Sequence, residues 1–99
     1  MLEIGAFNQM WHQIHLGPDN AARTFHAVAG AADETARAAG LLMPIHWGLF
    51  NLALHAWRQP IERLTQLADA QGFKLWSPEP GRPTEVLPGT ELRSGWWRL

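Results

Sequence analysis

The sequence predicts an α/β domain, because stretches typical of strands alternate with stretches typical of helices along the chain. The predicted order is strand, helix, strand, helix, strand, strand. The clearest strand is Leu41–Ile45, an apolar run that leads directly into His46 and the pair Trp47-Gly48. Open α/β folds place ligands at the carboxyl ends of their strands, so His46 is the first candidate for a functional residue.

The amino-terminal half is predicted to contain one strand and one helix. Residues Leu2–Phe7 are expected to form the strand, followed by a loop with large side chains at residues 8–16. The stretch Gly17-Pro18-Asp19-Asn20 is a helix-start signal, and we expect Asp19 to cap the helix. Gly40 is a natural position for that helix to end.

The carboxyl-terminal half is predicted to contain a second helix that begins at Gln59-Pro60 and ends at Gly72. Its apolar residues are spaced to form one stripe, at Ile61, Leu64, Leu67 and Ala68. Residues 73–76 are predicted to form a strand, and residues 85–87 a last short strand. The intervening residues 77–83, with three prolines and one glycine, are predicted to form a loop.

Composition excludes several classes of function. A net charge of −1 offers no basic face for nucleic acid, and the absence of cysteine excludes disulfides and thiolate metal sites. No stretch has the roughly 20 apolar residues of a membrane span, and no signal-peptide pattern is present, so we expect a cytoplasmic protein and leave membrane association open. Six tryptophans are many for 99 residues and indicate a surface that another chain covers.

The residues themselves offer part of a catalytic site. Histidine is a good zinc ligand, and His12, His15 and His46 together could hold one ion. The alternative is that His46 is a core histidine bonded to a backbone carbonyl. No acidic residue stands where a general base is expected, since Glu3 lies at the terminus. Neither a G-x-S-x-G nucleophile motif nor a glycine-rich phosphate loop is present.

Three blocks of sequence resemble metallo-β-lactamase-fold hydrolases, in the branch of N-acyl-phosphatidylethanolamine-hydrolysing phospholipase D, with ascorbate-6-phosphate lactonase-like proteins as more distant relatives. Ile45-His46-Trp47-Gly48-Leu49-Phe50 is similar to the family signature I-H-W-G-T-F. Ile4-Gly5-Ala6-Phe7, then Trp11, then the stretch from His15 to Ala21 is similar to I-G-A-Y, W and H-x-D-P-E-E-A. Gln59-Pro60 stands where the family has Glu-Pro, so the resemblance covers about residues 2–72.

The resemblance implies that residues 1–99 are a single partial domain, the C-terminal third of a metallo-β-lactamase αβ/βα sandwich. It implies a binuclear zinc site in which the metals polarise a phosphoryl or carbonyl oxygen and activate water. His46 would be the last zinc ligand, and His15 would be a catalytic residue that lies beside the site and contacts the substrate or the transition state. Trp11 and Trp47 would contact the substrate as part of the surrounding wall. The substrate would be a phosphodiester or a lactone.

The chain departs from the family pattern in its metal ligands. The ligand cluster H-x-H-x-D-H is absent, and one ligand histidine cannot hold two metals. We therefore expect the isolated chain to be inactive and its partner to be the N-terminal part of the hydrolase. Residues Val28–Ala36 are expected to be an insertion relative to the family. The alternative function is a non-catalytic interaction module that packs its aromatic face on a partner chain.

Overall fold

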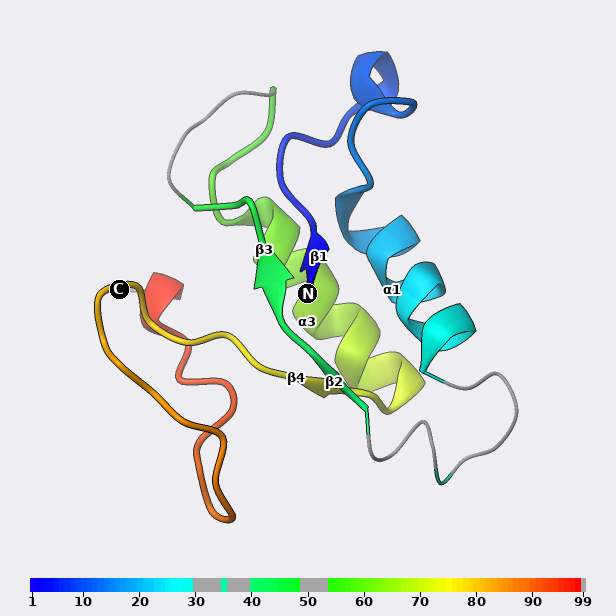
Figure 1. The fold of residues 1–99 in the computed structure, drawn as a ribbon. Helices are drawn as coiled ribbons and strands as arrows, with labels where there is room; N and C mark the ends of the chain where they lie inside the picture. Colours follow the sequence, from blue (N-terminus) through cyan, green and yellow to red (C-terminus); the bar gives the residue numbers. More distant parts are fainter. Residues whose placement is uncertain (30–34, 36–39, 49–53, 99) are drawn as a thin grey trace.

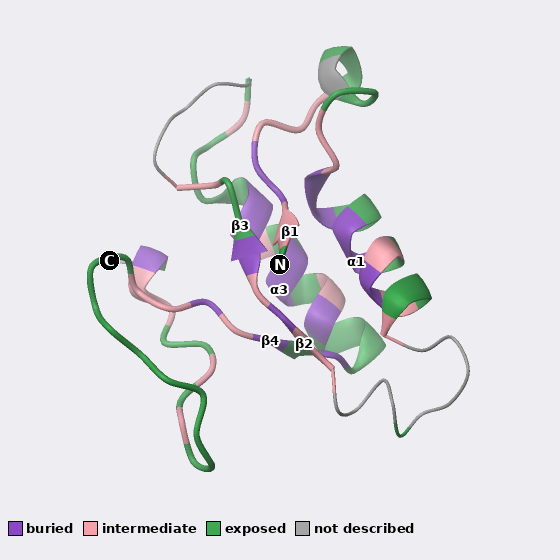
Figure 2. Cartoon of the chain, in the orientation of Figure 1, coloured by how far each residue is buried: buried purple, intermediate pink, exposed green. Residues whose placement is uncertain are grey.

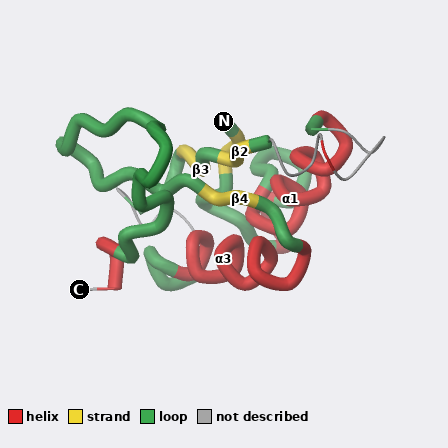
Figure 3. The backbone as a smooth tube through the Cα atoms, turned by 90° about the horizontal axis from the view of Figure 1, so that it is seen from below, coloured by secondary structure: helices red, strands yellow, loops and turns green. Residues whose placement is uncertain are grey.

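The computed structural model describes residues 1–29, 35, 40–48 and 54–98, and for Trp11 the backbone alone. Within these residues two helices of 12 and 13 residues pack against short parallel strands (Figure 1). Seen along the plane of the strands, α3 lies on one side of them (Figure 3). The elements in order are β1 (Leu2–Glu3), a 3-10 turn (Gln9–Trp11), α1 (Gly17–Val28), β2 (Leu41–Leu42), β3 (Pro44–Ile45), α3 (Gln59–Gln71), β4 (Lys74–Leu75) and a second 3-10 turn (Trp96–Arg98).

The predicted central strand is confirmed, and it is flanked by a parallel neighbour on each side. β1 pairs with β3, and β2 pairs with β4. The Met43 carbonyl accepts a hydrogen bond from the Leu2 N–H at 3.1 Å, and the Leu42 carbonyl accepts one from the Trp76 N–H at 2.8 Å. Successive carbonyls of a strand point in opposite directions, so β1 and β4 lie on opposite edges of this segment.

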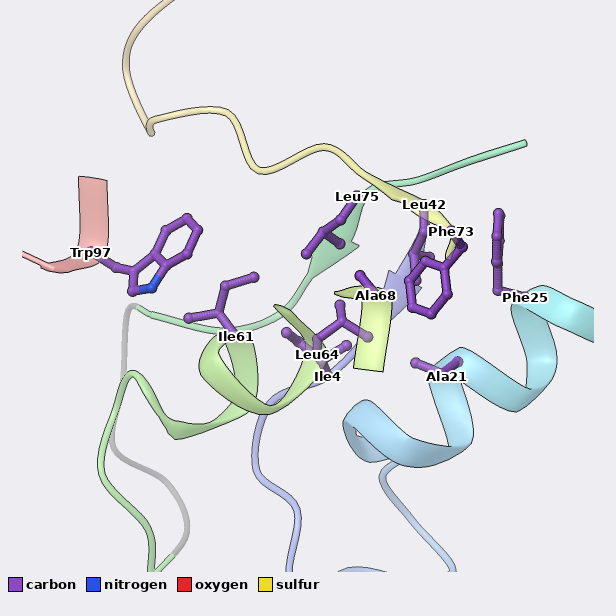
Figure 4. Close-up of a cluster of buried hydrophobic side chains, with 11 residues drawn as sticks. Ile4, Ala21, Phe25, Leu42, Ile61, Leu64, Ala68, Phe73, Leu75 and Trp97 are labelled. Atoms are coloured by element: carbon purple, nitrogen blue, oxygen red, sulfur yellow. The ribbon is translucent and has the colours of Figure 1, made fainter. Parts of the chain in front are cut away.

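Each helix buries one face, and α3 buries most of the stripe that its sequence predicts. In α3 the residues Ile61, Leu64 and Ala68 are buried, and the helix ends at Gly72, whose φ of 73° is left-handed. The buried surfaces of the helices face the strands (Figure 2). Together they enclose one hydrophobic core (Figure 4), made of Ile4, Ala21, Ala22, Phe25, Leu42, Ile61, Leu64, Ala68, Phe73, Leu75 and Trp97.

Two predicted strands differ from the structure. The first strand is shorter than Leu2–Phe7, because the chain turns at Ala6, which has a φ of 51°. Residues 85–87 form no strand, so the last element of the predicted order is wrong. This stretch lies between Pro83 and Pro88, and prolines lack the N–H that a strand ladder needs. A single parallel bridge from Ser77 to Arg93 is found instead.

The first helix also begins differently from the prediction. Asp19 does not cap it; the N-cap position is Leu16, without a side-chain cap, and Asp19 pairs with Arg63 at 2.7 Å. Most of the expected insertion, Val28–Ala36, lies outside the described residues. No helix among the described residues is long and apolar enough to cross a membrane.

Replacing Gly5 tests how closely the ends of β1 and β3 approach. A Cβ at Gly5 would lie 1.9 Å from the carbonyl oxygen of His46, a backbone atom that cannot rotate away. We expect Gly5→Ala to lower the free energy of unfolding, measured in urea, by about 3 kcal/mol. At Gly81 nothing lies within 4 Å of the added Cβ, so Gly81→Ala should cost only about 1 kcal/mol for its positive φ. Equal losses for the two variants would contradict the close approach.

Candidate functional site

Three side chains with metal-binding atoms meet where β1 and β3 end. Glu3 is the last residue of β1, and His46 follows β3 directly. His15 lies just before α1. One ligand atom from each residue lies within 4.8 Å of the others. Parallel pairing brings the two strand ends side by side (Figure 1), which confirms that His46 lies at a strand end.

Glu3 holds both histidines by hydrogen bonds. Its Oε2 atom accepts from Nδ1 of His46 at 2.8 Å and from Nδ1 of His15 at 3.1 Å. Its Oε1 atom accepts from the backbone N–H of Leu16. An ionised carboxylate only accepts, so Nδ1 carries the proton in each ring and Nε2 carries the lone pair of the neutral imidazole. Histidines that bind metals in proteins are oriented in this way by a carboxylate.

The backbone at His46 adopts a conformation that is unusual for a residue with a side chain. Its φ is 61°, in the left-handed region. Such a conformation costs about 1 kcal/mol or more and is found often at functional sites. Gly5 packs directly against the carbonyl of His46, so both strand ends contribute to holding this turn. The site is therefore fixed by backbone packing as well as by side-chain hydrogen bonds.

Burial and charge differ among the three residues. The side chain of His46 is 53% exposed, against 19% for His15 and 25% for Glu3. The interpretation of His46 as a core histidine bonded to a carbonyl is therefore wrong. Partial burial alone would raise the pKa of the Glu3 carboxyl. The hydrogen bonds from His46, from the Leu16 N–H and from His15 lower this pKa by more, so Glu3 is ionised at neutral pH.

The other histidines lie outside this cluster. His12 contacts the carbonyl of Gln9 through Nδ1 at 2.7 Å and is not among the grouped residues, so the set of His12, His15 and His46 does not form. His55 contacts a backbone carbonyl, and His26 contacts Gln71 at an exposed position.

The two tryptophans expected to contact the substrate have different outcomes. Trp47, next to His46, stacks on Trp96 with ring centroids 5.2 Å apart. The side chain of Trp11 lies outside the described part of the chain.

Glu3 is the residue that sequence reasoning missed. The sequence assigns Glu3 no role, because it lies at the terminus. The signal that could have found it is the one used for His46, a polar side chain at the end of an apolar strand. Only the pairing of Glu3 with Ile45 in the parallel register shows that the two ends meet.

The donor set fits one zinc ion. Zinc binds imidazole nitrogen and carboxylate oxygen, and many catalytic sites hold it with two histidines and one glutamate. Glu3 can serve as a direct ligand or as the carboxylate that orients the two rings. Three ligands do not suffice for two ions. A binuclear centre would need further ligands from beyond the described residues.

The chain is similar in sequence to one part of several longer proteins. Proteins described as uncharacterized, from Mycobacterium bovis and from two strains of Mycobacterium tuberculosis, are 37% identical to it over 99 residues. The matches include all of this chain but 25% of each relative, so the chain spans about a quarter of their length. No protein-family profile and no solved structure matches the chain.

The hydrogen bonds to Glu3 predict a dependence of stability on pH. Because folding lowers the pKa of Glu3, its contribution to stability is complete above the unfolded value near 4.5 and is lost as the pH falls through the lower folded value. We expect Glu3→Gln to reduce the loss of stability between pH 6 and pH 3, measured by urea unfolding at each pH. Glu85→Gln is the control, at an exposed position outside the cluster. An unchanged pH profile in Glu3→Gln would contradict the assignment.

Proposed function

We propose that this chain is the C-terminal segment of a zinc-dependent hydrolase of the metallo-β-lactamase fold, acting on phosphodiesters or lactones. The observation that carries the proposal is the meeting of Glu3, His15 and His46 at adjacent strand ends. Two blocks that resemble the family, 4–7 and 45–50, contact each other where Gly5 packs on the carbonyl of His46.

Each residue of the cluster has a role in this proposal. His46, the most exposed residue of the cluster, binds zinc through Nε2. His15 lies beside the ion and contacts the substrate. Glu3 accepts the Nδ1–H groups of both rings, which orients the rings and leaves the lone pair of each neutral ring on Nε2. Zinc, when bound, supplies Lewis-acid chemistry to a phosphoryl or carbonyl oxygen.

The proposal includes a partner, because one ligand histidine cannot hold the two ions of the family site. The relatives are about four times as long as this chain, which leaves ample sequence for further ligands. Several large apolar side chains are exposed, among them Met10, Ile14 and Leu54 at 80%, 70% and 92%. These would be covered in a larger protein. The same observation favours the second candidate function, a non-catalytic module that binds another chain.

Zinc binding by the isolated chain tests the role of the cluster. We expect at most one weakly bound zinc per chain, measured by competition with a chromophoric chelator. His46→Ala should weaken binding at least tenfold, and Glu3→Gln about tenfold to a hundredfold through loss of ring orientation. His12→Ala is the matched control and should leave the affinity unchanged, since His12 lies outside the cluster. Two tightly bound zinc ions per chain would overturn the proposal that the site is partial.

Reconstitution separates the two candidate functions. The chain is mixed with the remainder of a mycobacterial relative, made without the matching 99 residues, and zinc. We expect hydrolysis of bis(p-nitrophenyl) phosphate or of dihydrocoumarin, a lactone, by the mixture and by neither part alone. A His46→Ala chain should bind the remainder without restoring hydrolysis. Tight binding without hydrolysis by the unmodified chain would favour the interaction module instead.

A further inference from the structure

The turn that carries His46 has an unfavourable backbone that its neighbours hold in place. His46 and Gly48, on either side of Trp47, have φ values of 61° and 80°, both left-handed. A residue with a Cβ keeps such a conformation only where the surrounding structure imposes it. Gly5 packs on the carbonyl of His46 from the β1 side, while the imidazole itself is exposed. The side chain of Trp47, which packs against the core, is a further attachment of this turn.

Two indole rings of the carboxyl-terminal segment contact Trp47. Its ring stacks on Trp96, with centroids 5.2 Å apart and planes at 29°, and meets the ring of Trp97 edge-on at 5.7 Å. Trp96 and Trp97 also meet edge-on, at 5.9 Å, so each ring contacts the other two. A Cβ at Gly48 would lie 3.7 Å from Cη2 of Trp96, so the Trp96 ring lies against both residues that follow His46. The stacked pair also lines a cleft of about 440 Å³ beside His46.

Glu62, in the first turn of α3, fixes the 3-10 turn that contains both of these tryptophans. Its Oε1 atom accepts hydrogen bonds from Nε1 of Trp97 at 3.0 Å and from Nε of Arg98 at 2.8 Å. Its Oε2 atom accepts from Nη2 of Arg98 at 2.7 Å, which completes a bidentate pair. These three hydrogen bonds, the Glu62 clasp, set the place of Trp96 relative to α3. Trp96 lies outside residues 2–72, where the chain resembles the family, so the resemblance assigns it no role.

We propose that Trp96 is a positioning residue for His46. The Glu62 clasp holds Trp96, and the Trp96 ring holds Trp47. Trp47 in turn keeps His46 in the left-handed conformation that presents its Nδ1 atom to Glu3. Without the Trp96 ring, the backbone at residue 46 relaxes toward negative φ and the imidazole turns away from the carboxylate. That His46 binds zinc rests on the proposed function; the positioning itself requires no metal.

The protonation of the histidine rings in the metal-free chain at pH 8 tests the positioning. Long-range ¹H–¹⁵N spectra show which ring nitrogen carries the proton. We expect Trp96→Ala to convert His46 from the Nδ1-protonated form to a mixture of both forms, because Glu3 no longer holds its ring. His15 should keep its Nδ1 proton, since it reaches the same carboxylate from the loop before α1. A loss of structure throughout the chain would change both rings, so the difference between them is the readout.

Zinc affinity, measured by competition with a chromophoric chelator, should fall about tenfold in Trp96→Ala, as for other residues that orient a ligand histidine. The indole N–H of Trp96 has no hydrogen-bond partner within the described residues, so Trp96→Phe loses no hydrogen bond and should restore the affinity to within about threefold. Glu62→Gln removes the charge of the clasp and should weaken binding about threefold. Arg63→Gln is the matched control. It breaks a bidentate pair with Asp19 at the next residue of α3 and should change neither the affinity nor the His46 spectrum.

An unchanged His46 spectrum in Trp96→Ala would overturn the proposal, as would an equal change at His15 and His46. If Trp96→Ala does not fold, Glu62→Gln decides between the same outcomes. A chain that binds no zinc, but in which Trp96→Ala removes the Nδ1 proton of His46 alone, refutes the hydrolase and keeps the positioning role. Zinc binding that depends on His46 but is unaffected by Trp96→Ala refutes the positioning role alone.

Discussion

The parallel pairing of β1 with β3 is the contact on which the candidate site depends. The register that places Leu2 opposite Pro44 and Glu3 opposite Ile45 brings residues more than 40 positions apart to one edge. A slip of one residue would turn the Glu3 side chain to the other face of the strand and remove its hydrogen bonds to both histidines. Gly5 fixes this register sterically, because no larger residue fits against the carbonyl of His46.

The sequence predicts those parts of the fold that local signals define. The helix Gln59–Gln71 agrees with its prediction because a proline near its start, an apolar stripe and a glycine at its end all act within one segment. The central strand agrees because its apolar run is continuous. The wrong strand at residues 85–87 and the missed role of Glu3 have different causes. The prolines on both sides of residues 85–87 lack the N–H that a strand ladder needs. The role of Glu3 depends on the pairing of β1 with β3, and pairing between distant segments leaves no periodic trace in either one.

The tryptophans, abundant for so short a chain, have several structural roles. Trp97 is buried in the core and donates its indole N–H to Glu62 at 3.0 Å. Trp47 and Trp96 stack on each other beside the candidate site. Aromatic packing thus extends from the core at α3 toward His46. Trp47 and Trp96, which belong to the aromatic surface expected to contact another chain, also line a cleft. The proposed role as a segment of a larger protein rests on the partial site and on the exposed apolar side chains.

The protonation of the two histidine rings tests the central arrangement most directly. Long-range ¹H–¹⁵N spectra of the metal-free chain at pH 8 distinguish a proton on Nδ1 from a proton on Nε2. The hydrogen bonds to Glu3 predict the Nδ1-protonated form for both His15 and His46, and its loss in Glu3→Gln. The Nε2-protonated form of either ring in the unmodified chain would contradict the account, because Glu3 could then not hold the two histidines together.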